Sequence, residues 1–317
     1  MLQKFILPLF LITLMASACQ STTPASPRLS QRSAAQIVLR DLIRVELSQG
    51  TLSNGTLGLV YIDPLEFSDL EDLEQKLRVD FEGVSISLFR VGEGSRTRLC
   101  GLLPVPYTRA PGAAQVLVSW MGSQESSQRL QVGFQVGEGK YSSEVLKVQA
   151  HKVTPTRKKD LQRIEQEVAE VSEIYKTITP QRYWRGAFRF PIESAVTSEF
   201  GTKRVYNGRL KNFHTGLDLR AAMNTPIYAP APGKVVLAKD LFFTGNTVIL
   251  DHGQGLITLY AHLNEIRVKK GDVLQEKQIV GLSGKTGRVN GPHLHWQSVI
   301  HGVKVNPLGL TQSWMPE

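Results

Sequence analysis

The sequence predicts a mainly β protein in which two β-rich domains are joined by a single helix. Residues 36–150 and 186–310 carry short apolar runs separated by Gly and Pro turn residues, without a sustained helical period. Between them, one segment repeats apolar residues every three to four positions, which is the period of a helix. The expected organisation is a signal peptide over 1–18, a tether over 19–35, a β-sandwich-like module over 36–150, a helical connector over 151–185, a C-terminal antiparallel β-sheet domain over 186–310 and a tail over 311–317.

The N-terminal residues have the three parts of a secretory signal peptide. Lys4 supplies the positive start, residues 5–15 form an apolar run too short to span a membrane in the mature protein, and Ala16-Ser17-Ala18 is a small-residue cleavage site. The net charge of +9 predicts attraction to polyanions, for which nucleic acid is the usual candidate. Because the chain is expected to be exported, we predict contact with cell-wall or membrane anions and no nucleic-acid partner.

Cys19, directly after the cleavage site, has two interpretations. It is the lipid-bearing cysteine of a bacterial lipoprotein, with residues 21–27 as a flexible tether, or a bystander after an ordinary cleavage site. Ala16 stands where a lipobox usually has Leu. The favoured first interpretation predicts an envelope anchor, in the outer membrane facing the periplasm in a Gram-negative cell because Gln20 follows. Cys100 is the only other cysteine, so we expect a buried thiol and no intramolecular disulfide.

Residues 36–150 are expected to form a β-sandwich. Turn residues separate short apolar runs at the spacing typical of that architecture. Nothing in this module has catalytic spacing, so its expected role is binding, spacing or regulation, including contact with a regulatory protein partner. The expected strands cover residues 56–62, 84–91, 98–103, 114–120, 130–136 and 144–148.

A helix is predicted over residues 156–178, ending before Thr179-Pro180. Its apolar residues follow a three-to-four spacing and should form one stripe that packs on a neighbouring domain. The stripe consists of Leu161, Ile164, Val168, Val171 and Tyr175.

Residues 186–310 are predicted to form an antiparallel β-sheet domain. Gly-rich turns separate strand-length runs, and no long helical period occurs. The expected strands cover residues 226–230, 234–238, 247–251, 256–262, 279–283 and 293–300.

Five polar residues of this domain are of the types that form a hydrolytic metal centre. They occur in H-T-G-L-D (214–218), Y-A-H-L (260–263) and G-P-H-L-H-W (291–296). A single histidine or an H-x-x-x-D pair arises by chance, whereas H-x-H on a strand directs both imidazoles to one face. Two imidazoles and a carboxylate leave a zinc ion one open position for water, and two further histidines can transfer protons. The residues alone favour a zinc hydrolase.

Four segments carry a more specific pattern: S-E-F-G-T-K-R (198–204), N-G-R-L-K-N-F-H-T-G-L-D (207–218), D-H-G-Q-G-L-I-T-L-Y-A-H-L (251–263) and G-K-T-G-R-V-N-G-P-H-L-H-W (284–296). Through them, residues 190–309 closely resemble the M23 (LytM or lysostaphin-like) zinc endopeptidases of bacterial cell walls. The resemblance implies a β-sheet groove that holds an extended peptide. The preceding module and helix look, more loosely, like the N-terminal region of some periplasmic M23 proteins.

The resemblance also implies roles for the five residues. By it, His214, Asp218 and His295 are the ligands of one zinc ion per chain. His262 and His293 are the catalytic histidines that flank the water.

The implied function is a zinc-dependent peptidoglycan endopeptidase that cuts a peptide bond in cross-linked stem peptides. The expected bond is the D-alanyl–diaminopimelate cross-link in a Gram-negative host, whereas a polyglycine bridge would indicate a Gram-positive one. Arg204, Arg209 and Lys211 either lie in a solvated loop or receive stem carboxylates. The alternatives are a non-catalytic or self-inhibited activator of wall amidases and a purely structural envelope lipoprotein. Five filled positions argue against a non-catalytic activator and against a structural lipoprotein. They leave the self-inhibited alternative open, in which the N-terminal module or the helix blocks the groove as a regulatory lid.

Overall fold

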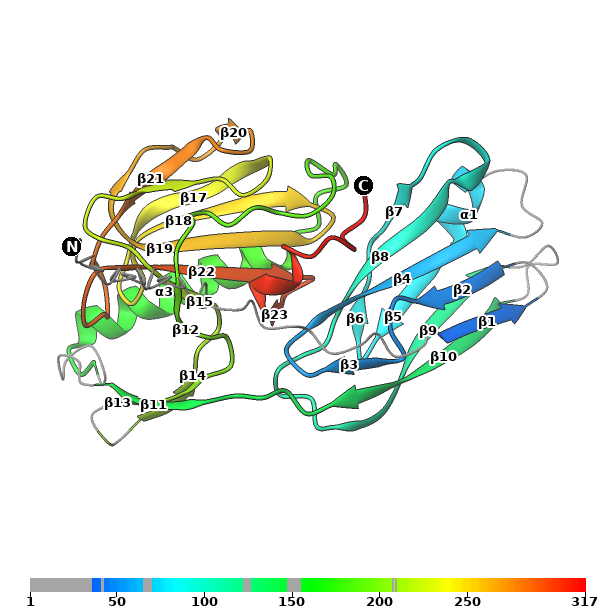
Figure 1. Cartoon of the computed structure of the whole chain (residues 1–317), viewed down its shortest axis with the longest axis horizontal. Coiled ribbons are helices and arrows are strands. Elements are labelled where there is room, and N and C mark those ends of the chain that lie inside the picture. Colours follow the sequence, from blue (N-terminus) through cyan, green and yellow to red (C-terminus); the bar gives the residue numbers. More distant parts are fainter. Residues whose placement is uncertain are drawn as a thin grey trace, which may run out of the picture. The chain divides into compact units, whose positions relative to one another are not determined.

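The computed structural model describes residues 36–40, 43–64, 70–121, 127–146, 155–206, 208 and 210–317. Cys19, the signal peptide, the tether and Arg209 lie outside the described residues, as does the side chain of Lys211. Strands dominate the described part, so the prediction of a mainly β chain with antiparallel sheets is confirmed (Figure 1).

The N-terminal domain consists of two five-stranded sheets. Along β10 (Ser127–Gly137), Leu130, Val132, Phe134 and Val136 are buried while their neighbours are more exposed, as expected when one face of a sheet covers a core. The first sheet has the order β1 (Gln36–Arg40), β2 (Ile43–Leu47), β4 (Leu57–Pro64), β8 (Arg98–Pro104), β7 (Leu88–Val91). The second has the order β3 (Thr51–Ser53), β10 (Ser127–Gly137), β9 (Gly112–Met121), β5 (Arg78–Phe81), β6 (Val84–Ser85).

The single strand expected over residues 84–91 is two strands. β6 belongs to one sheet and β7 to the other, and the buried Ile86 lies between them. An apolar run does not reveal this crossing, because both strands contribute to the same core. The short helix α1 (Leu70–Lys76), which was not predicted, covers that core with Leu73.

The predicted connector helix is α3 (Lys158–Lys176), but its predicted stripe is wrong at two positions. Leu161 and Val168 are 48% and 60% exposed, whereas Val171, Ile174 and Tyr175 pack against the C-terminal sheet. The N-terminal half of α3 is held by polar contacts instead: Arg163 Nη2 lies 2.8 Å from an Asp240 carboxylate oxygen, and the Phe242 backbone N–H donates to Glu167 at 2.7 Å. Among the described residues, no helix combines the length and apolar character needed to cross a membrane.

The C-terminal domain is a ten-stranded antiparallel sheet. Its central strands β19 (Leu256–Ile266) and β22 (His293–Ile300) are buried along most of their length, because one apolar cluster covers one face and a second cluster covers the other. The helix α3 lies over this second face (Figure 1). The path β12 (Val196–Ser198), β15 (Leu217–Arg220), β22 (His293–Ile300), β19 (Leu256–Ile266), β18 (Gly245–Gly253), β17 (Gly233–Leu241), β20 (Val273–Leu274) forms most of the sheet. Three strands join it at the sides: β16 (Pro226–Tyr228), β21 (Ile279–Ser283) and β23 (Val303–Val305).

A small three-stranded sheet lies beside this domain. The strand expected over residues 144–148 is present as β11 (Ser143–Leu146), but it is not part of the sandwich. It pairs in parallel with β13 (Lys203–Tyr206), which pairs in turn with β14 (Leu210–Phe213). The residue pattern along the sequence predicts that a strand exists, but it does not show with which distant strand that strand pairs.

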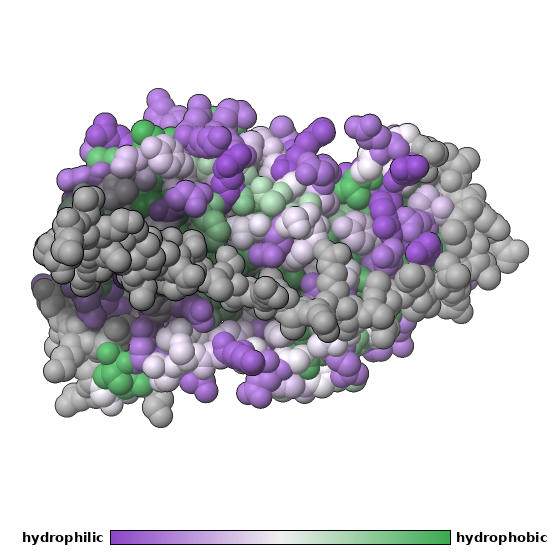
Figure 2. All heavy atoms as spheres, viewed as in Figure 1, coloured by the Kyte–Doolittle hydropathy of each residue, from purple (hydrophilic) through white to green (hydrophobic). Residues whose placement is uncertain are grey.

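A further apolar cluster contains residues of β4, β7 and β8 together with residues of the C-terminal domain. Trp184 is fully buried there between Phe89 and Phe188, with ring centroids 5.6 and 5.8 Å away. Cys100 lies in the same cluster as a buried free thiol, as expected, and burial raises its pKa. Figure 2 shows hydrophilic side chains spread over the described surface on one face, with hydrophobic residues in small patches, in keeping with these internal clusters.

His252 on β18 is a fully buried histidine outside the metal centre. Its Nδ1 donates to the Pro232 carbonyl oxygen at 2.7 Å, and its Nε2 lies 2.7 Å from the Thr258 hydroxyl. Burial lowers its pKa to about 4. A histidine in the unfolded chain has a pKa of about 6.5. Between pH 4 and pH 6.5 the unfolded state therefore binds more protons at His252 than the folded state does, so the free energy of unfolding rises with pH in that window.

Acidification from pH 7 to pH 4 should therefore cost about 3 kcal/mol of folding free energy at His252 alone. In a His252→Gln variant this contribution is absent, so the free energy of unfolding should fall less steeply with pH. Urea unfolding of both proteins at several pH values measures the difference. Parallel pH profiles for the two would contradict the assignment.

Candidate metal centre

Strand register brings a carboxylate and an imidazole face to face. Asp218 on β15 is paired directly with His295 on β22. His214 lies in the short turn between β14 and β15, where its backbone N–H donates to Thr202 and its carbonyl accepts from Gly201. The structure thus brings together three residues that are far apart along the chain.

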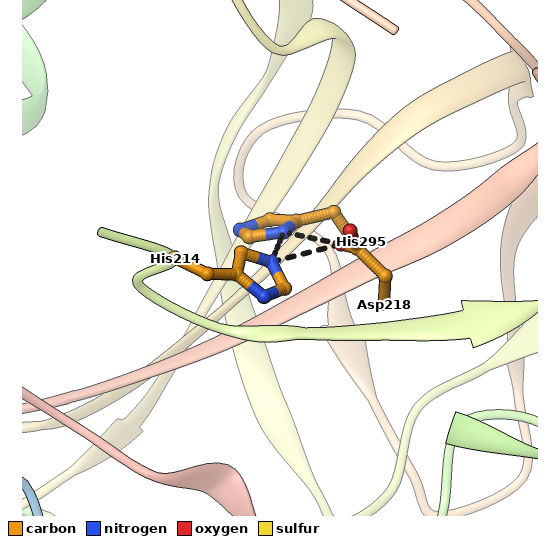
Figure 3. Close-up of side chains that lie close together, drawn as sticks. All are labelled: His214, Asp218 and His295. Carbon is orange, nitrogen blue, oxygen red and sulfur yellow. Dashed lines mark hydrogen bonds and ion pairs between the residues drawn. The ribbon is translucent and has the colours of Figure 1, made fainter. Parts of the chain in front are cut away.

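The three side chains converge on one point (Figure 3). His214 Nε2 lies 2.9 Å from Asp218 Oδ1 and 2.9 Å from His295 Nδ1, and the last two atoms are 3.0 Å apart. Their residues are only 1%, 7% and 7% exposed. Three donor atoms at mutual distances this short, shielded from bulk water, fit one small ion.

Hydrogen bonding fixes the tautomer of His214. Its Nδ1 lies 3.0 Å from the Glu199 carbonyl oxygen, which can only accept, so Nδ1 carries the proton. The lone pair of Nε2 therefore points toward Asp218 and His295. A backbone carbonyl behind the distal ring nitrogen is the usual support of a metal-binding histidine. The residues present fit a zinc ion, because two imidazole nitrogens and one carboxylate oxygen form a common ligand set for it.

The protonation states also suit a cation. Burial raises the pKa of Asp218, but its close contacts with the His214 and His295 imidazoles outweigh burial and hold that pKa well below its usual range. Burial lowers the pKa of His295 to about 4, although its hydrogen bond with Asp218 opposes the shift. At neutral pH Asp218 is therefore a carboxylate and His295 a neutral imidazole, which are the forms that bind a metal.

His262 reaches the same site through an irregularity in β19. Between the pairs Asn246–Leu263 and Val248–Tyr260, β19 has one more residue than β18, which is a β-bulge. His262 has φ of 63°, a left-handed conformation that is costly for a residue with a Cβ. Strain of this kind is concentrated at functional sites.

A carbonyl orients each of the two remaining histidines. His262 Nδ1 donates to the Thr286 carbonyl oxygen at 2.9 Å, and His293 Nδ1 to the Gly291 carbonyl oxygen at 2.9 Å. The two ring centroids are 4.9 Å apart, and His293 Nε2 lies 3.7 Å from Asp218 Oδ1. Burial, followed by the charges of His293 and His295, lowers the pKa of His262 well below its usual value. The Nε2 atom of His262 is therefore an unprotonated acceptor at the site.

A cavity of about 400 Å³ opens beside these groups. Asp218, His262 and His293 line it together with basic side chains. Of the predicted substrate-binding residues, Arg204 lines the cavity, but its guanidinium is held by Glu144, Ser198 and Asp218. Motif reasoning missed two further cavity arginines, Arg220 and Arg288, and the Thr286 carbonyl.

Comparison with known proteins agrees with this geometry. Residues 212–307 match the model of peptidase family M23. The peptidoglycan DD-endopeptidase ShyA of Vibrio cholerae is 37% identical over 123 residues, covering 38% of this chain and 29% of the relative. The DD-carboxypeptidase/endopeptidase Mpg of Neisseria meningitidis is 34% identical over 119 residues, covering 38% of this chain and 27% of the relative. The chain therefore spans less than a third of the length of these relatives.

One solved structure extends the likeness beyond the family segment. A crystal structure of an M23 peptidase from Pseudomonas aeruginosa is 28% identical and superposes with a TM-score of 0.61, covering 83% of this chain and 96% of that chain. The shared fold thus includes much of the chain that precedes residue 212. The chain therefore carries a peptidase M23 domain over residues 212–307, near its C-terminal end.

Proposed function

We propose that this protein is a zinc-dependent endopeptidase that hydrolyses a peptide bond between cross-linked stem peptides of peptidoglycan. The observation that carries the proposal is the convergence of His214, Asp218 and His295 within 3.0 Å of one another beside a cavity that also holds His262 and His293. Relatives named as peptidoglycan DD-endopeptidases support the substrate class.

His214, Asp218 and His295 would hold the zinc ion. When bound, it would supply Lewis acidity to polarise a peptide carbonyl and acidify a water. His262 and His293 would handle the protons, because each presents an Nε2 whose orientation is fixed by a carbonyl at Nδ1. The low pKa of His262 keeps it neutral and able to accept a proton at neutral pH.

The cavity also suits an anionic peptide. Arg220 and Arg288 line it, and stem peptides carry free carboxylates. We propose the D-alanyl–diaminopimelate cross-link as the bond, in keeping with the DD-endopeptidase relatives. An envelope address with Cys19 as the lipid-bearing residue, which the N-terminal sequence favours, would place the enzyme beside its substrate. Metabolic labelling with a fatty acid tests that address, and an unlabelled protein recovered without detergent would contradict it.

Digestion of purified sacculi tests the activity. The full chain should convert cross-linked dimers to monomers, as seen by mass analysis of muramidase-released fragments, and a chelator should stop the conversion until zinc is restored. Cleavage at the sugar–lactoyl amide would mean an amidase. Absence of cleavage together with stimulation of an added amidase would replace the endopeptidase by an activator.

A further inference from the structure

Strand β11 brings a carboxylate to the metal centre from outside the matched family segment. That segment begins at residue 212, whereas β11 covers Ser143–Leu146. In the parallel pairing of β11 with β13, Glu144 lies opposite Arg204. The Lys203 backbone N–H donates to the Ser142 carbonyl oxygen at 2.9 Å and holds this register.

Arg204 joins Glu144 to Asp218. Its Nε donates to Glu144 Oε1 at 2.6 Å, and its Nη2 donates to Asp218 Oδ2 at 2.5 Å. The Arg204 and Asp218 side chains are only 14% and 9% exposed, so solvent screens this pair weakly. Oδ1 of the same carboxylate is the oxygen that faces His214 and His295. Oδ2 of Asp218 therefore binds Arg204, whereas Oδ1 faces the two histidines of the metal site.

Ser198 extends the same contacts to a second metal-binding residue. Its hydroxyl lies 3.2 Å from Glu144 Oε1, 3.1 Å from Arg204 Nη2 and 3.3 Å from His214 Nδ1. Because a carboxylate only accepts and a guanidinium only donates, Ser198 donates to Glu144 and accepts from Arg204. Glu144 thus anchors groups that touch both Asp218 and His214.

The segment before β11 is itself held in place. The Tyr141 hydroxyl donates to the Asn54 carbonyl oxygen, and its ring packs edge-on against Tyr107 at a centroid distance of 4.6 Å. Gly201 makes room for that ring: its φ is +82°, and a Cβ there would lie 2.1 Å from the Tyr141 ring. These contacts place Glu144 at a defined position and not on a free linker.

We propose that Glu144 is a positioning residue of the metal centre, acting through Arg204 to keep Asp218 Oδ1 directed at the metal. The inference rests on the proposed metal site and not on the reaction that the site performs. Without the Glu144 charge, Arg204 would lose one of its two carboxylate partners, which would leave more positive charge beside the ion and weaken the hold on the guanidinium that orients Asp218. The electrostatic and geometric effects both weaken metal binding.

The test measures zinc affinity of the full chain by competition with a chromophoric chelator. Groups that orient metal ligands typically contribute 10- to 100-fold to affinity, so Glu144→Gln and Arg204→Gln should each raise the zinc Kd by about 10- to 100-fold. Glu144→Asp, which keeps the charge, should lose less than Glu144→Gln. Because both residues act along one path, the double variant should lose little more than Arg204→Gln alone. The absorption spectrum of the cobalt-loaded protein should shift in the same variants.

Glu276→Gln is the matched control. It removes the partner of Arg189 in an ion pair of the same domain outside the cavity lining, and its zinc Kd should stay at the wild-type value. A Glu144→Gln protein that binds zinc as tightly as the wild type does would overturn the inference. If that protein also hydrolysed its substrate faster, Glu144 would be an obstruction instead. Wild-type zinc binding without sacculus cleavage would count against the proposed function alone.

Discussion

Replacing His214 or Asp218 by alanine is expected to abolish zinc binding and hydrolysis together while the domain remains folded. Each substitution removes one of three atoms that lie 2.9–3.0 Å apart. Since groups that merely orient a ligand contribute about 10- to 100-fold to metal affinity, loss of a ligand should exceed about 100-fold. Zinc content of the purified protein should fall from one ion per chain to near zero, and sacculus cleavage to background.

The control for this loss is a histidine of the same domain that lies outside the cavity lining. His301, in the turn between β22 and β23, fits this purpose, and His301→Gln should keep its zinc and its activity. Circular dichroism separates metal loss from unfolding. His214→Ala is the cleaner substitution, because Asp218→Ala also leaves Arg204 without one of its partners. Full zinc content in either alanine variant would show that the ligand set is wrong.

Part of this site followed from local sequence rules. His293 and His295 are two residues apart on a strand, so a period of two places them on one face, and β22 is that strand. The runs over residues 247–251 and 256–262 predicted β18 and β19 within a few residues of their ends. These features depend only on neighbouring residues.

Other parts of the site depend on long-range register, which a local pattern does not contain. Asp218 meets His295 across 77 positions of sequence. In β19, a strict period of two would put His262 on the face of Tyr260, whose ring is fully buried in the core. The bulge re-aims His262, and the Thr286 carbonyl orients it. Residue type and the family resemblance indicated that His262 belongs to the site, whereas the strand period did not.

Glu144 is the clearest case of a residue that sequence reasoning missed. It lies 68 positions before the first residue of the matched segment, in a strand that looks like the end of the N-terminal module. Nothing around it resembles a metal motif. Its proximity to Arg204 appears only when β11 pairs with β13. A parallel pairing over this distance is set by tertiary structure and not by strand propensity.

Removing either cavity histidine should uncouple zinc binding from turnover. His293→Ala and His262→Asn are expected to keep one zinc per chain and lose about 10²- to 10⁴-fold in rate, the usual contribution of a general acid–base group. Asn is the better replacement at position 262, because the backbone there has φ of 63° and Asn adopts left-handed conformations more readily than Ala. The measurements are zinc content and the single-turnover rate on a cross-linked muropeptide dimer.

Variants of His262 and His293 also show whether these histidines transfer protons or help to hold the metal. Backbone carbonyls at Nδ1 orient both rings, so the position of each histidine does not depend on a bound metal. If the two histidines serve one proton path, the double variant should be scarcely slower than the worse single variant, since groups that act as a unit are not additive. Independent roles would multiply the two losses. A variant that keeps zinc and the wild-type rate has no part in the chemistry, whereas one that loses zinc must be counted among the ligands.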